Sequence, residues 1–455
     1  MTRLPTVCVI GAGCSGIASV KALTDRGFEF DCFEASDRVG GLWVYANRNG
    51  LSAAYRSLHL NTSRKRTEYA DFPMPASYPD FPHHSQVAAY FDAYVDRFGL
   101  RDRIAFETTV TRAERLDDGR WAVSTDGGTA RTYDALIVAN GHHWDPRWPE
   151  PPFPGHERFA GTQLHSHDYT GDDPGFFRDK SVVVLGMGNS AMDIAVDASF
   201  VASDVFLAAR RGAWVLPKYL LGRPFDTLQA SPRIPFAIRR RASQALLRVL
   251  VGDMERYGLP QPDHGLFEAH PTVSDDVLSR IAHGEITPKP NIAELTERTV
   301  RFVDGTEVVT DVVVYCTGYK VTFPFFDEDF IAAPDNDLPL FRRTFHPGIP
   351  NVFFVGLLQP LGAIMPIAEE QSEWISDFLA GRYALPGPGA LRADIEAERR
   401  RMFKRYVASK RHTMQVDFDD WMVATAKERK AGAERASMQG GRQPVAARAA
   451  TTVAA

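Results

Sequence analysis

The sequence predicts an α/β protein with two dinucleotide-binding, Rossmann-like domains, the second inserted into the first. Three observations predict this fold. A glycine-rich turn follows a short apolar strand near the start of the chain, and a turn of the same kind recurs roughly 175 residues later. Each turn is followed by a helical pattern and a further strand, which is the order of a βαβ unit. A chain of 455 residues also has room for two such cores and a tail.

The first βαβ unit occupies the start of the chain. Residues 5–10, PTVCVI, form a short apolar run that ends in glycines. Residues 17–23 have a helical pattern, and residues 28–34, FEFDCFE, predict a second strand.

The first turn has the pattern G-x-G-x-x-G, formed by Gly11, Gly13 and Gly16. The first glycine allows a tight turn, the second lets the backbone approach a pyrophosphate, and the third lets helix and strand pack closely. The helix then points its free N–H groups at phosphate. Glu34 ends the next strand, where its carboxylate can accept the hydroxyls of an adenine ribose. A ribose with a free 2′-hydroxyl fits FAD, and the alternative is a glycine turn of an ordinary α/β protein.

The second turn follows the strand SVVVLG and has the pattern G-x-G-x-x-A, formed by Gly186, Gly188 and Ala191. Alanine at the third position still permits close packing. The next strand, DVFLAA, ends in Arg210 and Arg211 rather than in an acid. A carboxylate there would repel a 2′-phosphate, whereas an arginine fork can bind one through two hydrogen bonds. The second site therefore favours NADPH over NADH, and the alternative for the two arginines is a solvated strand end.

We expect four segments along the chain. The first part of the FAD-binding domain covers residues 1–157, the inserted NADPH-binding domain residues 158–285, the second part of the FAD-binding domain residues 286–425, and a disordered tail residues 426–455. The proline-rich stretch RWPEPPFPG predicts a linker before the insertion, because proline cannot hold regular hydrogen-bonded structure. The tail has few large apolar residues, which predicts disorder.

Composition excludes several other classes. A formal net charge of −5 gives no electrostatic reason for nucleic-acid binding. None of the four cysteines stands in a Cys-x-x-Cys pair, which argues against a disulfide reductase, and low cysteine usage is compatible with the cytoplasm. We expect no signal peptide, and no stretch reaches the roughly 18 apolar residues that a membrane helix needs. We expect no metal, because the adjacent histidines have no acid or cysteine at ligand spacing.

A set of motifs carries a family resemblance. Residues 159–169 form the pattern F-x-G-x-x-x-H-x-x-x-Y, and further motifs stand at compatible spacings: GGLW, NTSRK, DFPMP, GMGNSAMD, RRGAWVLPK, CTGY and GLLQPLGAIMPIAEEQ. With these motifs the chain resembles the flavin-containing monooxygenases, single-polypeptide enzymes that use FAD and NADPH. The related Baeyer–Villiger monooxygenases usually have Trp and then Pro or Asp where this chain has Tyr169 and Thr170. The chain departs from the better-known animal members in having Ala191 in place of a glycine. We also expect no membrane anchor at the C-terminus, which by the resemblance would imply a soluble, bacterial-type enzyme.

The resemblance implies roles for particular residues. It assigns the following residues to cofactors: Gly41, Leu42, Trp43 and Gln359 to FAD, and Ser190 with Arg210 and Arg211 to NADPH. Asn61 matches the family's active-site asparagine, whose amide can donate to a peroxide oxygen or to the nicotinamide ribose region. The alternative for Asn61 is a helix cap, since N-T-S before a charged run is also capping chemistry.

The resemblance also implies a mechanism and partners. NADPH would reduce FAD by hydride transfer, the reduced flavin would react with O2 to form a C4a-hydroperoxide, and an amine nitrogen or sulfide sulfur would attack its distal oxygen. The protein would exclude water from the site. A Baeyer–Villiger oxygenase acting on ketones and a non-catalytic redox sensor are the alternatives. A homodimer is an expectation from the family alone.

Overall fold

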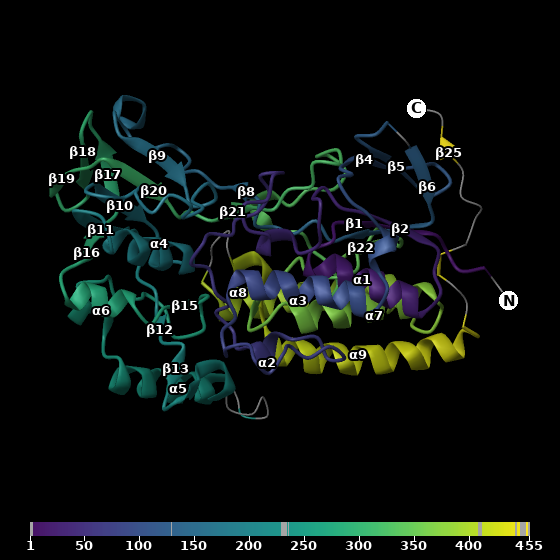
Figure 1. Ribbon diagram of the computed structural model, residues 1–455. Helices are drawn as coiled ribbons and strands as arrows, with labels where there is room; N and C mark the ends of the chain where they lie inside the picture. Colours follow the sequence, from purple (N-terminus) through teal and green to yellow (C-terminus); the bar gives the residue numbers. More distant parts are fainter. Residues whose placement is uncertain are drawn as a thin grey trace.

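Two units, each built on a parallel sheet, lie side by side in the molecule (Figure 1). The computed structural model describes residues 3–128, 130–228, 234, 236–407, 412–441, 444–445 and 452–453. We call residues 147–318 the inserted unit and the rest of the chain the first unit. The predicted fold class, α/β with two Rossmann-like units of which one is inserted into the other, is confirmed.

The sheet of the first unit has five parallel strands in the order β3–β2–β1–β7–β22. These strands are β1 (Val7–Ile10), β2 (Phe30–Phe33), β3 (Ile104–Ala105), β7 (Ala135–Val138) and β22 (Val352–Phe354). β1 and β7 are buried along their whole length, as expected for strands that are covered on both faces. The chain order reverses at β1, because β2 lies on one side of it and β7 on the other. Such a reversal opens a crevice at the carboxyl ends of the strands, where folds of this kind bind ligands.

Helices cover one face of this sheet and a small antiparallel sheet covers the other (Figure 1). The helices are α1 (Cys14–Asp25), α3 (His84–Arg97) and α7 (Met365–Leu379), and the small sheet contains β4 (Val110–Arg115), β5 (Trp121–Thr125), β6 (Ala130–Tyr133) and β25 (Thr452–Val453). Val7 and Val9 of β1 point into the core with the helices, whereas Cys8 and Ile10 point into the core with the small sheet. Successive side chains of a strand alternate in this way, so each face of β1 anchors one layer.

The inserted unit has its own parallel sheet, with the order β16–β11–β10–β20–β9. Its strands are β9 (Thr162–His165), β10 (Ser181–Leu185), β11 (Asp204–Ala209), β16 (Thr287–Pro290) and β20 (Val312–Tyr315). The expected end of the insertion at residue 285 is therefore wrong, because β16 and β20 both lie beyond it. β20 sits between β10 and β9, with Val312 opposite Val182 on one side and Thr162 on the other.

Helices and a three-stranded antiparallel sheet complete the inserted unit (Figure 1). They are α4 (Asn189–Ser199), α5 (Phe236–Leu250), α6 (Val277–Ala282), β17 (Ile292–Leu295), β18 (Thr299–Phe302) and β19 (Glu307–Val309). Val182 and Val184 of β10 pack with α4, whereas Val183 and Leu185 pack with the antiparallel strands. The two units therefore have separate cores, each arranged around a central strand that a glycine turn follows.

Both chain crossings between the units run through one short pair of strands. β8 (Asp145–Pro146) leads into the inserted unit and β21 (Tyr319–Lys320) leads out of it. The two strands pair antiparallel, with Tyr319 opposite Pro146 and Lys320 opposite Asp145. The covalent boundaries of the inserted unit therefore lie next to each other, at residues 147 and 318.

The C-terminal region returns to the first unit. β23 (Gln359–Leu361) pairs with β24 (Gln415–Asp417). Along the chain, α8 (Pro388–Arg405) precedes β24 and α9 (Phe418–Met438) follows it. The expected disordered tail is wrong over residues 426–438, because α9 runs through them. Residues 442–443, 446–451 and 454–455 of that tail lie outside the described residues.

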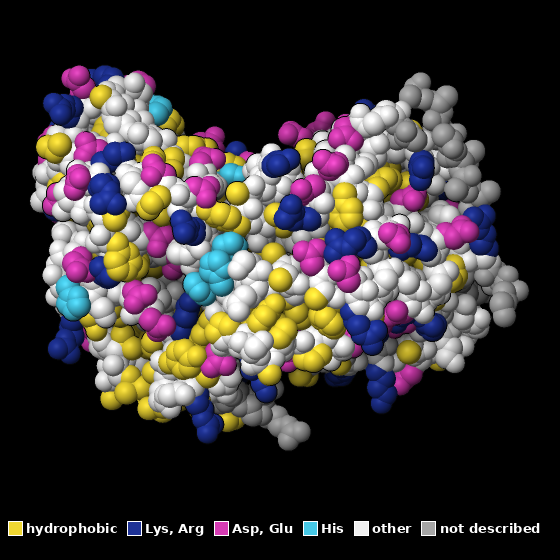
Figure 2. Space-filling model, in the orientation of Figure 1, with side chains coloured by type: hydrophobic (Ala, Val, Ile, Leu, Met, Phe, Trp, Pro, Cys, Tyr) yellow, Lys and Arg dark blue, Asp and Glu magenta, His cyan; other side chains and the backbone are white. Residues whose placement is uncertain are grey.

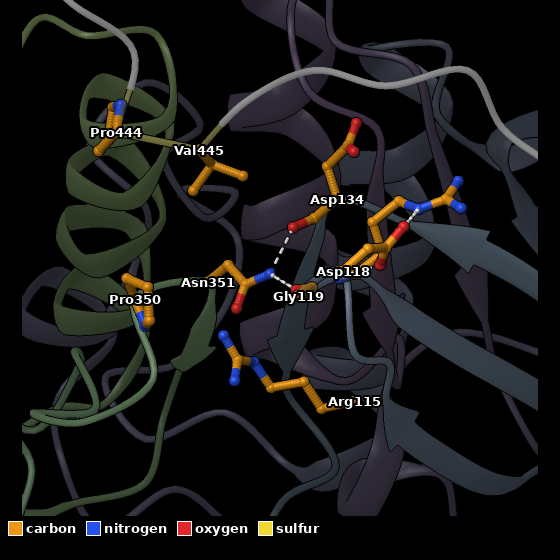
Figure 3. A pocket seen from close by; sticks show the side chains of 9 residues that line it. Arg115, Asp118, Gly119, Asp134, Pro350, Asn351, Pro444 and Val445 are labelled. Carbon is orange, nitrogen blue, oxygen red and sulfur yellow. Dashed lines mark hydrogen bonds and ion pairs between the residues drawn. The ribbon is translucent and has the colours of Figure 1, made fainter.

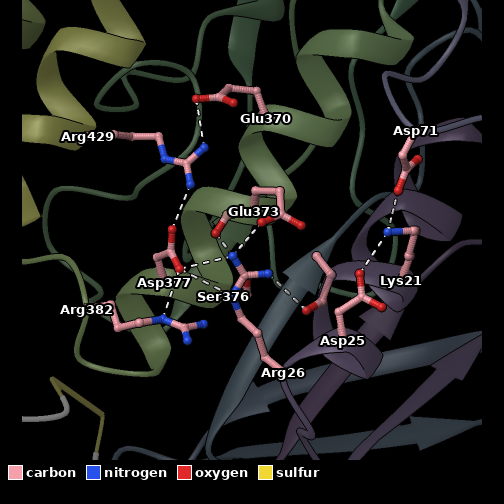
Figure 4. Close-up of polar contacts among 11 residues, drawn as sticks. Lys21, Asp25, Arg26, Asp71, Glu370, Glu373, Ser376, Asp377, Arg382 and Arg429 are labelled. Carbon is pink, nitrogen blue, oxygen red and sulfur yellow. Dashed lines mark hydrogen bonds and ion pairs between the residues drawn. The ribbon is translucent and has the colours of Figure 1, made fainter.

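Charged side chains hold α9 to the first unit (Figure 4). Arg429 of α9 contacts Asp377 at 2.6 Å and Glu370 at 2.9 Å, both on α7. The carboxylate of Asp377 also forms ion pairs with the guanidinium groups of Arg26, at 3.0 Å, and Arg382, at 3.1 Å. One carboxylate of α7 thus contacts three segments of the chain, and one of these segments is α9.

The other elements are short. They are α2 (Arg64–Thr67), β12 (Val215–Leu216), β13 (Tyr219–Leu220), β14 (Arg223–Pro224), β15 (Thr272–Val273) and the 3₁₀ turns at Gly41–Trp43, Arg101–Arg103, His156–Arg158, Phe225–Leu228, Met254–Tyr257, Pro334–Asn336 and His412–Met414.

Candidate cofactor and active site

The first glycine turn is closely packed against the end of β7. Gly11 has φ +97°, and a Cβ at this position would lie 2.6 Å from the carbonyl oxygen of Ala139. A Cβ on Gly16 would lie 1.8 Å from the carbonyl oxygen of Gly11. Both positions therefore require glycine for the turn itself, as the motif predicts.

Gly13 has a different environment. It is the N-cap residue of α1, with φ −70°, and no side chain caps the first turn of the helix. A Cβ on Gly13 would meet its nearest neighbour, the Cα of Gly41, at 3.6 Å, which is an ordinary contact. The protein alone thus leaves room above Gly13, next to the unpaired N–H groups at the start of α1. This is the arrangement that a pyrophosphate needs.

Glu34 lies directly beside the turn. One carboxylate oxygen accepts the backbone N–H of Ala12 at 2.6 Å and the other accepts that of Ser36 at 2.8 Å. The side chain is buried, with 7 % of the residue exposed, and this burial raises the pKa of Glu34 although the two N–H groups lower it. The backbone thus fixes the orientation of the carboxylate, and each oxygen retains a second lone pair for a ribose hydroxyl.

Two distant segments also reach the first turn. Gly41, with Leu42 and Trp43, forms a 3₁₀ turn whose first residue lies against Gly13. Gly356, with φ +76°, lies against the N-terminal turn of α1, because a Cβ there would be 2.1 Å from Oγ of Ser15. Gln359 follows on β23 and is half-buried.

The second glycine turn repeats the geometry of the first. Gly186 has φ +145°, and a Cβ there would lie 2.7 Å from the carbonyl oxygen of Cys316, the residue after β20. Gly188 is the N-cap residue of α4, again without a capping side chain, and Ser190 follows in the first turn of the helix. Ala191 is fully buried beneath the turn, so its methyl group fills the space between helix and strand. These residues fit a second dinucleotide.

Arg210 and Arg211 follow β11 at the carboxyl edge of the sheet, which is the edge that carries the second turn. Both side chains are exposed, and the Nε atom of Arg211 is 3.8 Å from a carboxylate oxygen of Asp263. Since both groups of this pair are more than half exposed, the contact is weak and leaves the guanidinium available to a phosphate.

Asn61 lies in a bend just before α2. The N-cap residue of α2 is Ser63, so the structure does not support the alternative that Asn61 caps this helix. The flanks of the bend are fixed: the N–H of Leu60 donates to the carbonyl oxygen of Pro82 at 2.9 Å, and the N–H of Ser63 donates to a carboxylate oxygen of Asp226 at 2.7 Å. The half-buried amide of Asn61 has no hydrogen-bond partner within the described part of the chain.

Residues at the junction of the two units were not found from the sequence. Tyr55 and Ser57 of the first unit contact Asp193 and Asp197 of α4. Asp226 of the inserted unit contacts the segment that carries Asn61. The sequence feature that indicates this junction is the pair Asp193 and Asp197, four residues apart on a helix whose other side chains are mostly apolar. Two acids on one face of such a helix predict a polar partner for that face.

A small pocket of about 160 Å³ lies elsewhere, between the small antiparallel sheet and the C-terminal residues Pro444 and Val445 (Figure 3). Asn351 forms part of its wall, and its amide donates to the carbonyl oxygens of Gly119 at 2.8 Å and Asp134 at 2.7 Å. These contacts join strands of the first unit, so we assign no ligand to this pocket.

Both glycine turns thus fit dinucleotides, and the space-filling view is hollowed along its upper edge between the two units (Figure 2). Among the helices that the structure describes, we find none with the length and apolar character that crossing a bilayer requires. Over the same residues, no three His, Cys, Asp or Glu side chains converge as metal ligands.

Comparisons with known proteins point to one family. The sequence profile described as "Flavin-binding monooxygenase-like" matches residues 5–437. Flavin-containing monooxygenase 5 of Rattus norvegicus is 39% identical over 440 residues, which cover 92% of this chain and 82% of that protein. Dimethylaniline monooxygenase [N-oxide-forming] 2 of Mus musculus is 35% identical over 442 residues, which cover 93% and 82% of the two chains.

Solved structures have the same architecture. S-allyl-L-cysteine S-oxygenase from Allium sativum matches with a TM-score of 0.70 and 26% identity, over 97% of this chain and 94% of that chain. An oxidized steroid monooxygenase bound to NADP matches with a TM-score of 0.73 over 99% of both chains, and at 19% identity this match shows the fold alone.

Proposed function

Since the chain belongs to the flavin-binding monooxygenase-like family, we propose that it uses FAD and NADPH to transfer one oxygen atom from O2 to a soft nucleophile, an amine nitrogen or a sulfide sulfur. The chain is an enzyme of the flavin-containing monooxygenase class. A relative named for N-oxide formation and a structural neighbour named for S-oxygenation support both types of substrate.

One observation carries the assignment of the two cofactors. Two glycine turns of the same geometry lie in separate units. The strand after the first turn, β2, is followed by an acidic side chain, whereas the strand after the second turn, β11, is followed by two basic ones. The carboxylate of Glu34 suits a free 2′-hydroxyl, so we assign the first turn to the adenosine part of FAD. The guanidinium groups of Arg210 and Arg211 suit a 2′-phosphate, so we assign the second turn to NADPH.

The chemistry divides between the cofactor and the chain. Bound FAD supplies the redox chemistry, in which it accepts hydride from NADPH and activates O2. The open helix termini at Gly13 and Gly188 bind the two pyrophosphates. The amide of Asn61, which has no partner among the residues that the structure describes, would donate a hydrogen bond in the reaction site without releasing a proton. Gly41, Leu42, Trp43 and Gln359 are proposed to line the flavin.

The direct test uses the purified protein. We expect a yellow protein with bound FAD whose NADPH oxidation accelerates when a thioether or tertiary amine is added, with the sulfoxide or N-oxide formed and labelled by ¹⁸O2. A cyclic ketone is the parallel substrate, and lactone formation without sulfoxide or N-oxide would assign the chain to Baeyer–Villiger chemistry instead. NADPH oxidation that never responds to any substrate would support a redox sensor.

Asn61→Ala tests the proposed active site. We expect this variant to retain FAD but to release more H2O2 per NADPH oxidised, because a hydrogen-bond donor is lost from the reaction site. Gln359→Ala is the comparison for a residue that we assign to flavin contact alone. An unchanged ratio of H2O2 to product in Asn61→Ala would contradict the role of this residue.

Three further statements are proposals. We expect a cytoplasmic enzyme that acts on small molecules, no affinity for nucleic acid at the net charge of −5, and a homodimer. Cell fractionation, a DNA-binding assay and light scattering on the purified protein test these three statements.

A further inference from the structure

The two units meet along one face of α4. Asp193 and Asp197 are four residues apart, so they lie on the same side of this helix. The hydroxyl of Tyr55 donates to Asp193 at 2.5 Å, and the hydroxyl of Ser57 donates to Asp197 at 2.6 Å. Tyr169 donates to the same oxygen of Asp197 at 3.1 Å. Two carboxylates of the inserted unit are thus bound by hydroxyl groups, two of which come from residues 54–58 of the first unit.

The hydrogen bonds are partly buried, and the two tyrosines that donate to them are buried. Tyr55 is 3% exposed and Tyr169 is 7% exposed, and their ring centroids are 6.1 Å apart. Tyr55 belongs to the same apolar cluster as Ala191 and Ile194 of α4. Burial raises the pKa of Asp193 to about 6, although the hydroxyl of Tyr55 lowers it. In such surroundings a carboxylate is costly unless it is hydrogen-bonded, so these contacts are strong and specific.

The contact is close to the end of α4 that we assign to the pyrophosphate of NADPH. The helix begins at Asn189, so Asp193 lies about 6 Å along it at 1.5 Å per residue. A negative group at this distance opposes the binding of a pyrophosphate. Cofactor binding alone therefore does not explain an acid at this position, whereas its hydrogen bond to Tyr55 does.

The other side of the contact leads to the flavin site. The hydroxyl of Ser52 donates to the carbonyl oxygen of Leu42 at 2.7 Å, and Leu42 belongs to the turn that lies against Gly13. In the other direction, residues 54–58 continue to Leu60 and the bend of Asn61. A single segment therefore connects the FAD turn, the contact with α4 and the proposed active-site asparagine.

We propose that Asp193 and Asp197 are positioning residues, which fix α4 against residues 54–58 and thereby set where the nicotinamide lies relative to the flavin. This inference rests on the proposed function, because it assigns the two turns to NADPH and FAD. Hydride transfer depends on alignment of donor and acceptor, and a shift of about 1 Å costs up to about 100-fold in rate.

The test compares Tyr55→Phe and Ser57→Ala with the native holoenzyme. Each variant removes one hydroxyl group and keeps the rest of the side chain. Tyr383→Phe is the matched control, because Tyr383 is also buried and its hydroxyl also donates to a carboxylate, Glu428, but far from α4. We expect both junction variants to retain FAD and to be reduced by dithionite at the native rate.

Their reduction by saturating NADPH should be about 10-fold to 100-fold slower, with the KM for NADPH changed less than about threefold. Amide hydrogen exchange should also rise in residues 54–58 and 189–199 without NADP⁺ present, whereas Tyr383→Phe should leave both measurements native. Native reduction rates in both junction variants would overturn the inference, and so would rate losses that merely follow loss of FAD. If the native protein is not reduced by NADPH at all, the proposed function fails, and the exchange data then report on the junction alone.

Discussion

Replacing Gly13 with alanine separates cofactor binding from folding. The residue has φ −70°, which alanine adopts without strain, and the new methyl carbon would lie 3.6 Å from its nearest protein neighbour. The protein itself therefore tolerates the change. The methyl group would nevertheless occupy the space where a pyrophosphate approaches the start of α1.

We expect a small effect on the stability of the apoprotein and a large effect on its affinity for FAD. Alanine is a poorer N-cap than glycine, so we expect the apoprotein to lose about 1 kcal/mol or less of unfolding free energy. A pyrophosphate that is pushed away from the helix terminus loses hydrogen bonds to charged oxygens, each of which contributes about 1.5 to 3 kcal/mol. Loss of one such bond corresponds to a rise of about 10-fold to 150-fold in the Kd for FAD.

The assay is a fluorescence titration of deflavinated protein with FAD, together with the Tm of the apoprotein. Gly387→Ala is the matched control, because Gly387 is also an N-cap residue, with φ −58°, and no atom lies within 4 Å of its added Cβ. Gly16→Ala should instead prevent folding of the turn, since its Cβ would overlap the carbonyl oxygen of Gly11. A native Kd for FAD in Gly13→Ala would refute the placement of the pyrophosphate at this helix.

Further predictions concern charged groups. Glu34→Gln replaces one acceptor oxygen with an amide that faces a backbone N–H, so we expect weaker FAD binding in the same titration, and native affinity would contradict the ribose contact. Replacing Arg210 and Arg211 with Gln should raise the KM for NADPH about 10-fold or more without raising that for NADH, and equal effects on both would contradict phosphate binding. Asp377→Asn should lower the Tm at pH 7. Burial raises the pKa of Asp377, but contacts from Arg429 and other arginines outweigh this and lower it. The carboxylate therefore stabilises the fold above its ordinary pKa of about 3.9, and the Tm difference should disappear in scans at lower pH.

The sequence predicted both glycine turns because each combines a local pattern with a strand and a helix. It did not predict the end of the inserted unit. The runs DALIVANG and DVVVYCTGY have the same form, and a buried parallel strand carries no local signal for the sheet that it joins. Only the pairing shows that Val312–Tyr315 extends the second sheet whereas Ala135–Val138 extends the first.

Two other features depend on partners that are distant in sequence. A composition with few large apolar residues predicted disorder after residue 425, but Arg429 compensates through its contacts with Glu370 and Asp377. The junction at Asp193 involves a tyrosine 138 residues away. Both interactions join residues that are far apart in the sequence, so local reasoning finds the charged residues without finding what they bind.

The adjacent crossings at β8 and β21 have a consequence for how the two units are joined. Neighbouring strands lie about 4.8 Å apart, so the two points at which the chain enters and leaves the inserted unit lie side by side. Removing residues 147–318 would leave two strand ends that a tight turn can bridge, and the first sheet would keep all five of its strands. The inserted unit is therefore joined covalently to the first unit at a single place. Its orientation depends on the non-covalent contacts between side chains of the two units.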